Sequence, residues 1–343
     1  MRRSVSIEDI AQAAGVSHAT VSRALRDSAR ISPAMRATVQ RLAQEMGYTP
    51  NAVAQSLKGQ RTHTVGLVVT SIADPFYGRL ARGVDEGARQ ADMDVFLGIS
   101  HNNADEEMAV IESFQRRRVE GVITASSRLT DEQLEQLARS AMPVVLVNRQ
   151  SEGTHRTLPS VQVDNFGGAL LAVRHLIRLG HEKVAYLGAT NRPVANHERE
   201  RGYWHAMREA GLPLRDTWVK SGAVDRRSYS DDVEDGRRLM DEALRESVTA
   251  AFCFNDMHAV GALMACRDAG VTVPEGASIV GFDDVDTARY VSPPLTTIHQ
   301  PKLRLGQIAI GMLLRMMADE PVEDECVGVE LVARASAGPV RRT

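Results

Sequence analysis

Residues 5–58 constrain the fold of this chain more than any other stretch, because they contain the patterns of three short helices together with residues typical of helix ends. Serines precede each helix as N-caps, and glycines or a proline stand where a helix must end or begin. The residues that mark these ends are, in chain order, Ser6 with Asp9, Gly15, Ser17, Ser32 with Pro33, and Gly47. Apolar residues recur at helical spacing between the caps, so the stretch predicts a three-helix bundle.

The spacing of Ala11, Gly15 and Val21 is that of a helix-turn-helix, with a small residue at the helix crossing, a turn glycine and a buried β-branched residue. The second helix then presents a small, polar outer face made of His18, Ala19, Ser22 and Arg23. Such a face fits a DNA groove. The alternative is a plain helical cap on a larger domain, which has the same spacing.

Charge is distributed unevenly along the chain. Residues 1–62 hold nine Lys and Arg against four Asp and Glu, a net charge of +5, whereas the rest holds 32 against 40. A basic head on an acidic body is expected when one end of a protein meets phosphates. The charge therefore favours the DNA-binding interpretation over the plain cap.

Residues 51–58 predict a fourth helix that is too short to be stable in water by itself. Asn51 can cap it, and Val53, Ala54 and Leu57 share one face. Isolated helices need roughly 12–15 residues to persist. We therefore expect this segment to fold only when a partner holds it, with residues 59–62 as a linker.

From residue 63 onward, short β-rich runs alternate with helical patterns. The predicted strands are 65–70, 95–99, 121–125, 144–147, 184–187, 250–254 and 279–282. The predicted helices are 78–91, 106–118, 130–140, 167–179, 201–210, 231–244, 256–269 and 303–317. Runs without polar interruption suit parallel strands that are buried on both faces, and repeated βα units build doubly wound sheets. Two sets of units predict two similar lobes.

The sequence resembles the lactose-repressor/galactose-repressor family of bacterial transcription regulators. The similarity is carried by VSIEDIAQAAGVSHATVSRAL and MGYTPNAVAQSL in the head, and by FNDMHAVGALMACRDAGVTVPEGASIVGFDD and PPLTTIHQP in the body. It implies an all-α helix-turn-helix head at 1–50, a hinge helix and linker at 51–62, and an α/β two-lobe core at 63–343 like a periplasmic sugar-binding protein. The expected first lobe is 63–162 with 293–321, and the second is 163–292 with 322–343.

The resemblance also implies which residues contact DNA. The second helix would enter the major groove, where Arg23 can bind guanine and His18 a purine. Leu57 would act as an apolar wedge in the minor groove. The full expected set is Ser17, His18, Ala19, Thr20, Ser22, Arg23, Asn51, Ala54 and Leu57.

A small-molecule site is expected between the lobes, because ligands of doubly wound sheets bind at the carboxyl ends of the strands. By family position its residues are Phe76, Tyr77, Asn148, Arg199, Asn255 and Asp283. An aromatic face, amides, a guanidinium and a carboxylate suit a sugar or sugar derivative. Val224 stands where many relatives carry an aromatic residue, so ring stacking there is in doubt. Arg149 together with Arg199 leaves a sugar acid open as an alternative.

Several classes of protein are disfavoured. The sequence has no phosphate-binding glycine loop, HExxH or GxSxG motif, so an enzyme is not expected. We expect no cofactor and no metal. No apolar run reaches 18 residues, and the N-terminus has no signal-peptide pattern, which predicts a cytoplasmic protein without a membrane span.

The sequence as a whole therefore predicts a homodimeric repressor that binds a palindromic operator and is controlled allosterically by a sugar-like effector. It leaves open whether the effector releases DNA or promotes binding. The alternative is a cytoplasmic sugar-binding sensor without DNA binding.

Overall fold

The computed structural model describes residues 5–25, 27–48, 62–149, 158–221 and 230–340. The chain divides into two compact units, a head of residues 1–62 and a core unit of residues 63–343.

The head is a three-helix bundle whose helix ends follow the expected capping residues. Helix α1 spans Ile7–Ala14, with a capping box between Ser6 and Asp9 and with Gly15 in the left-handed conformation at φ 64°. Helix α2 spans His18–Ala24 and helix α3 spans Pro33–Glu45, each with its expected serine accepting a backbone hydrogen bond. The buried core is Ile10, Ala11, Val21, Ala24, Val39 and Ala43. The helix-turn-helix prediction is therefore confirmed in its geometry.

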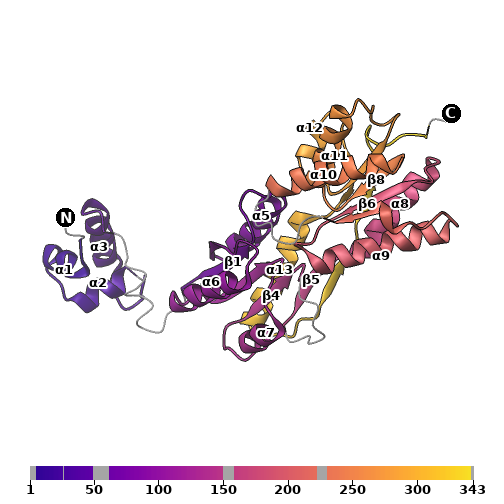
Figure 1. The fold of residues 1–343 in the computed structure, drawn as a ribbon. Helices are drawn as coiled ribbons and strands as arrows, with labels where there is room; N and C mark the ends of the chain where they lie inside the picture. The colour runs from indigo at the N-terminus through magenta and orange to yellow at the C-terminus, as the bar shows by residue number, and fades with distance from the viewer. Residues whose placement is uncertain (1–4, 26, 49–61, 150–157, 222–229, 341–343) are drawn as a thin grey trace. The chain divides into compact units, whose positions relative to one another are not determined.

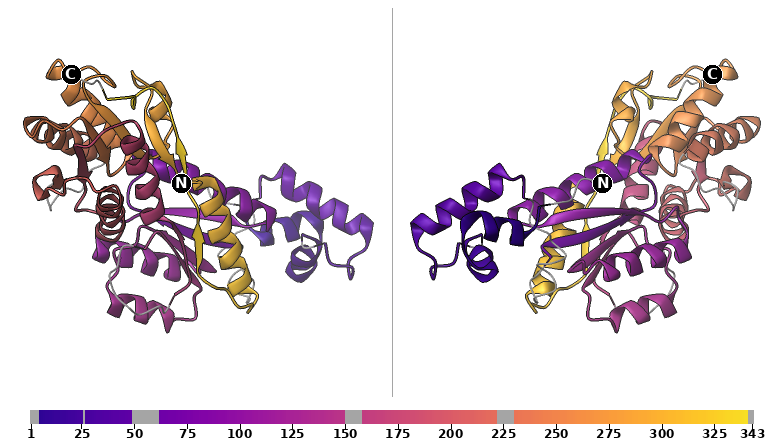
Figure 2. Two further views of the ribbon diagram at one scale, coloured as in Figure 1. Left: turned by 90° about the vertical axis from the view of Figure 1, so that its right-hand side faces the viewer. Right: turned by 90° about the vertical axis from the view of Figure 1, so that its left-hand side faces the viewer.

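The core unit contains two six-stranded sheets, each with helices packed against it (Figure 1, Figure 2). The first sheet has the order β11-β5-β4-β3-β1-β2, and the second has the order β12-β10-β9-β8-β6-β7. The strands of the first are β1 (Thr64–Val69), β2 (Asp94–Ile99), β3 (Gly121–Ala125), β4 (Val144–Val147), β5 (Ser160–Val163) and β11 (Glu325–Val327). Those of the second are β6 (Val184–Gly188), β7 (Val219–Ser221), β8 (Ala250–Cys253), β9 (Ser278–Asp283), β10 (Thr296–His299) and β12 (Glu330–Val332). Every described pair of strands except β10 with β12 is parallel, as the apolar runs predicted.

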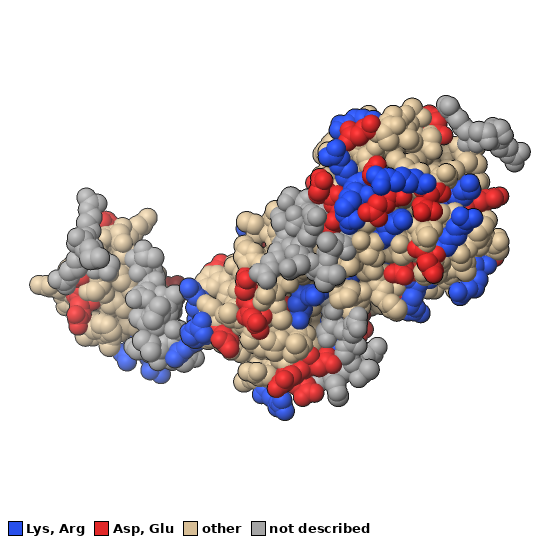
Figure 3. Space-filling model, in the orientation of Figure 1, with Lys and Arg blue, Asp and Glu red and all other residues tan. Residues whose placement is uncertain are grey.

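Helices connect successive strands in both lobes. The first lobe carries α5 (Pro75–Gln90), α6 (Ala104–Arg116), α7 (Asp131–Ala138) and α13 (Lys302–Met317). The second carries α8 (Asn165–Arg178), α9 (Pro193–Glu209), α10 (Ser230–Arg245), α11 (Asp256–Asp268) and the short α12 (Thr287–Tyr290). Lys and Arg are interleaved with Asp and Glu over the face of the core unit that Figure 3 shows. That face therefore has no single sign of charge.

The lobe boundaries near the C-terminus differ from the expected ones. Strand β10 pairs with β9 in the second sheet, so the chain returns to the first lobe after residue 299 and not at 293. Strand β11 pairs with β5 in the first sheet, so residues 325–327 belong to the first lobe and not to the second. Both strands are only three or four residues long, too short for periodicity to reveal which sheet they join.

Helix α9 also begins earlier than its apolar pattern suggested. It starts at Pro193 rather than near Arg201, because proline is pre-organised for the first helical position. The residues that follow Pro193 are mostly polar, so no apolar residues at helical spacing mark this part of the helix. As a result Arg199 lies inside the helix and does not begin it.

A buried histidine fastens the C-terminal segment to the second lobe. Burial lowers the pKa of His181, whose Nε2 lies 3.0 Å from the carbonyl oxygen of Gly338 and whose Nδ1 lies 3.0 Å from the Thr249 hydroxyl. In the unfolded chain the imidazole of His181 takes up a proton near pH 6.5, whereas in the folded protein it does so only at a lower pH. The stability that neutral His181 contributes is present above about pH 6.5 and is lost as the pH falls below it.

We expect His181→Gln to destabilise the core unit at pH 7.5 by several degrees, and the deficit to shrink as the pH falls to 5.5. Thermal unfolding at each pH measures this, with the exposed His101→Gln as the control. A deficit that is equal at both pH values would contradict the assignment.

Candidate functional site

The outer face of α2 is exposed where DNA contact was expected. Ser17, His18, Ala19 and Arg23 are exposed, while Thr20 and Ser22 are half-buried. Ser17 accepts the Thr20 amide hydrogen bond at 3.2 Å, and this cap fixes the start of the helix. Ser17, His18 and Ala19 lie at the start of α2 and Arg23 lies in its last turn, so exposed residues are present along the length of the helix. Asn51, Ala54 and Leu57 lie outside the described residues, as does Val224.

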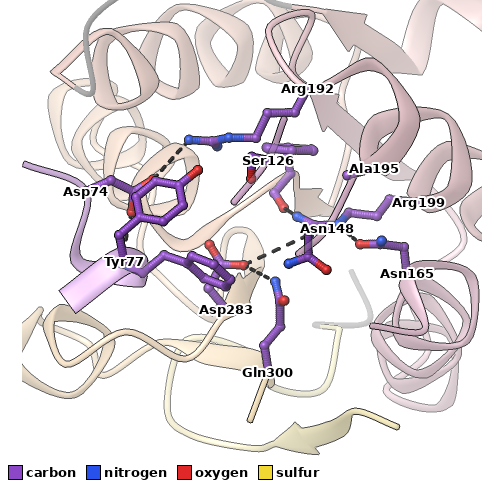
Figure 4. Close-up of a pocket in the computed structure, with 12 residues that line it drawn as sticks. Asp74, Tyr77, Ser126, Asn148, Asn165, Arg192, Ala195, Arg199, Asp283 and Gln300 are labelled. Carbon is purple, nitrogen blue, oxygen red and sulfur yellow. Dashed lines mark hydrogen bonds and ion pairs between the residues drawn. The ribbon is translucent and has the colours of Figure 1, made fainter. Parts of the chain in front are cut away.

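A pocket lies between the lobes at the carboxyl ends of the strands (Figure 4). The first lobe contributes Asp74, Phe76, Tyr77, Ser126 and Asn148, and the second contributes Asn165, Arg192, Ala195, Arg199, Phe254 and Asp283, with Gln300 on the return segment. Five of the six expected effector residues therefore meet in one cavity: Phe76, Tyr77, Asn148, Arg199 and Asp283.

Asn255 is the expected residue that does not line the pocket. It is buried, its Oδ1 caps α11 through the His258 amide at 2.8 Å, and its Nδ2 donates to Asp232 at 2.7 Å. Asn255 thus binds Asp232 and caps the first turn of α11, and both contacts lie behind the residues that line the cavity. The contact of Asn255 with an effector stays a prediction, because in this structure its side chain is turned to these buried partners.

Arg192 connects the two lobes across the pocket. Its guanidinium donates to Asp74 of the first lobe at 3.0 Å and to Asp232 of the second at 3.3 Å (Figure 4 draws the first contact). Burial by itself would lower the pKa of Arg192, but Asp232 and Asp74 hold it above its ordinary value. Burial raises the pKa of Asp74 to about 6 despite that partner.

Arg199 is fixed in place from four directions. Its Nε donates to Asn165 at 2.9 Å, its Nη1 donates to the carbonyl of Phe254, and its Nη2 lies 4.0 Å from an oxygen of Asp283. The ring centroids of Phe254 and Phe282 lie 4.5 Å and 3.7 Å from its guanidinium carbon Cζ. Burial lowers the pKa of Arg199 to about 10, so the group remains a cation at neutral pH.

Three of the lining residues, the last of a strand or the first after one, have a backbone conformation that favours glycine. Ser126 has φ 54°, Asn148 has φ 49° and Asp283 has φ 114°. Residues held in such regions cost about 1–3 kcal/mol each and are concentrated at functional sites. The conformation turns each side chain toward the cavity at the point where its strand ends.

Arg149 takes no part in the pocket. Its Nη2 lies 3.2 Å from Asp131 at the start of α7, on the first lobe. The two guanidinium groups that line the cavity are those of Arg192 and Arg199, so Arg149 and Arg199 do not form the expected pair there.

Sequence reasoning missed Asp74, Ser126, Asn165, Arg192, Ala195, Phe254 and Gln300 as lining residues. Asp74 and Ser126 had a usable signal, because each follows a predicted strand of the first lobe. Arg192 had none, since it lies in a polar stretch that was not recognised as the start of α9.

The site has no metal-binding geometry in the part of the chain that the structure describes, where no three His, Cys, Asp or Glu side chains cluster as ligands. Within the same residues, no helix combines the length and the apolar composition that a membrane crossing requires.

Comparison with known proteins gives matches over nearly the whole chain. Residues 6–51 match the family described as bacterial regulatory proteins, lacI family, and residues 62–329 match periplasmic binding proteins and the sugar binding domain of the LacI family. The HTH-type transcriptional regulator GalS of Salmonella typhimurium is 37% identical over 314 residues, which cover 91% of this chain and 89% of GalS.

Two solved structures are similar over almost their full lengths. One is the lac repressor dimer bound to operator and the anti-inducer ONPF, at 25% identity and a TM-score of 0.85, covering 98% of this chain and 100% of that one. The other is a complex of the transcriptional regulator CelR with cellobiose, at 30% identity and a TM-score of 0.71, covering 97% and 99%.

Proposed function

Because the chain belongs to the lacI family of bacterial regulatory proteins, we propose that a neutral, polyhydroxylated effector binds in the pocket between its lobes and controls the affinity of the protein for an operator. As a member of that family it is a DNA-binding transcriptional repressor under small-molecule control, and not an enzyme. Two copies related by a two-fold axis would read the two halves of a palindromic site. Since its partner is chromosomal DNA, we place it in the cytoplasm.

The charge balance of the pocket carries the proposal for the effector. Arg192 and Arg199 are matched in the lining by Asp74 and Asp283, with Asp232 directly behind Arg192. A ligand carboxylate would have to displace one of these buried partners and leave an uncompensated charge, which is costly. Hydroxyl groups can instead donate to the carboxylates and accept from the guanidinium and amide groups without changing the net charge.

Aromatic rings complete the fit to a sugar. Phe76 and Phe254 both line the cavity, where their apolar rings lie beside the polar groups. A pyranose or furanose ring has an apolar C–H face and a polar rim, which is the combination that these walls accept. We therefore favour neutral sugars over sugar acids as effectors.

A calorimetric screen tests this proposal. We expect one or more neutral mono- or disaccharides to bind, and their corresponding sugar acids to bind at least about tenfold more weakly. Binding of a sugar acid in preference to its neutral parent would overturn the proposal.

DNA binding is tested by gel shift against genomic fragments over a range of salt concentrations. Affinity must fall as the salt concentration rises, because phosphate contacts release counterions. A protein that binds sugar but no fragment at low salt would be the sensor without DNA binding. Footprinting of the bound fragments then gives the operator.

Arg23 is proposed as the main base-reading residue of α2. We expect Arg23→Ala to weaken operator binding by roughly 5- to 150-fold, since one bidentate contact to guanine contributes about 1–3 kcal/mol of discrimination. Arg41→Ala on α3 is the matched control, because Arg41 is also exposed and pairs with Glu45. Equal losses in the two variants would show that Arg23 contributes only general charge.

We further propose that control passes through residues 51–58. Closing the cleft around an effector would alter the pose of the first lobes in the dimer, and so the spacing of the two linkers. A helix this short gains or loses its structure at small cost, so that spacing can decide whether the heads bind.

A further inference from the structure

Lys302 occupies a position that two local rules disfavour. It is the first residue of α13, a 16-residue helix, where the partial positive charge of the helix terminus opposes a cation. It is also only 5% exposed, although lysine is rarely buried without partners. Residues that break local rules in this way often have a functional reason.

The partners of Lys302 are main-chain carbonyl groups. Its Nζ donates to the carbonyl oxygens of Asp283, of Asp284 at 3.1 Å and of Gln300 at 3.2 Å. Three acceptors satisfy the three hydrogens of an ammonium group. Two of them belong to the end of β9 in the second lobe, while the lysine itself begins a helix of the first lobe.

The backbone that Lys302 holds is strained. Asp283 has φ 114°, a conformation that residues other than glycine adopt only when their surroundings enforce it. Asp284 follows with φ 53°, in the left-handed region that aspartate visits more readily. The Asp283 side chain lines the pocket and accepts a hydrogen bond from the Gln300 side chain. The direction of this carboxylate therefore depends on a backbone turn that does not persist on its own.

The helix that carries Lys302 is a rigid support. Helix α13 packs so closely on α5 that a Cβ at Gly306 would lie 2.2 Å from the carbonyl oxygen of Leu80, and one at Gly83 would lie 2.1 Å from that of Leu303. Helix α5 also supplies Phe76 and Tyr77 to the cavity. An ammonium group on α13 is thus fixed relative to the first-lobe wall of the pocket.

We propose that Lys302 is a positioning residue, which clamps the strained turn at Asp283 and Asp284 onto the first lobe and so aims the Asp283 carboxylate into the pocket. The clamp itself follows from the contacts, whereas its consequence for ligand binding rests on the proposed function. The clamp can be correct even if the proposed effector binding is not, so the experiment measures the protection of backbone amides and not ligand binding.

Hydrogen exchange of the full-length protein, followed by mass spectrometry, tests the clamp. In Lys302→Met, we expect amides of the peptide around 283–285 and of Gln300, whose amide faces the Asp283 carbonyl, to exchange at least tenfold faster. Amides of α13 beyond its first turn should be unchanged. Arg304→Met is the matched control, because Arg304 is exposed in the same helical turn and should change neither region.

Two further variants separate strain from charge. Asp283→Gly accepts the backbone conformation without strain, so adding Lys302→Met to it should cause less than a twofold further change in exchange. Asp283→Asn removes the charge but keeps the strain, so Lys302→Met should still accelerate exchange tenfold in that background. If Lys302→Met does not fold by itself, the double variant with glycine should fold and the one with asparagine should not.

Uniform acceleration throughout α13, or no change at 283–285, would overturn the clamp. Equal effects in the glycine and asparagine backgrounds would also overturn it, because Lys302 would then act only as a counter-ion.

Discussion

Gly306→Ala should lower the thermal unfolding temperature of the core unit by on the order of 10 °C or prevent folding altogether. The added Cβ would lie 2.2 Å from the carbonyl oxygen of Leu80 and 2.9 Å from the amide nitrogen of Val84, both in the backbone of α5. Neither atom can rotate away, so α5 and α13 would have to separate. Overpacking of this kind costs about 3 kcal/mol or more when the backbone must move.

The same helix provides the control with the opposite sign. Gly311, five residues further along α13, has nothing within 4 Å of a Cβ added to it. Replacing a helical glycine by alanine in open space stabilises by roughly 0.5–1 kcal/mol, so Gly311→Ala should raise the unfolding temperature slightly. If both alanine variants shifted stability in the same direction, the close packing of α13 on α5 would be wrong.

Arg199→Lys should reduce the affinity for the effector by at least about tenfold, and it should also lower the thermal unfolding temperature of the core unit. Lysine keeps the positive charge but lacks the planar fork, so it cannot serve Asn165 and the Phe254 carbonyl together. It also lacks the flat face that lies between Phe254 and Phe282. Both lost hydrogen bonds lie within the protein, so each costs about 1.5–3 kcal/mol of stability, and their loss also releases the cation from the position it holds in the wall of the pocket.

Calorimetry with the sugar found in the screen measures the loss, and thermal unfolding checks the fold. Arg201→Lys on the same helix is the control, because Arg201 is exposed and pairs with Glu198. An affinity within about threefold of the unmodified protein would show that Arg199 only supports the wall of the pocket.

Much of the architecture could be predicted from local chemistry. The bounds of α1 were predicted to the residue, because a helix ends where its own caps stand, at Ser6 and Gly15. The seven strands predicted from apolar runs were located within one residue at each end, because strands buried on both faces of a parallel sheet read as nearly continuous apolar runs. The buried strand β5 was not predicted, since polar residues interrupt it. Short strands such as β10 and β11 were not predicted, because their pairing depends on partners elsewhere in the chain.

The pocket was predictable only in part. Phe76, Asn148 and Asp283 lie at strand ends or in the first turn that follows a strand, so position in the chain indicated them. The choice between the neighbours Asn148 and Arg149 rested on family position, because composition does not show which one faces the cavity. In the structure Asn148 lines the cavity, with its backbone in the left-handed conformation, and Arg149 pairs with Asp131.

The sequence by itself determined the parts of this protein whose causes are local: the helix-turn-helix head, the buried strands and the family. Only the tertiary structure decided which charges meet. Arg192 and Asp74 are 118 residues apart and join the two lobes, and Lys302 reaches carbonyl groups 18 and 19 residues back in the chain. Electrostatic pairing depends on distance and burial in three dimensions, and the spacing of residues along a chain determines neither.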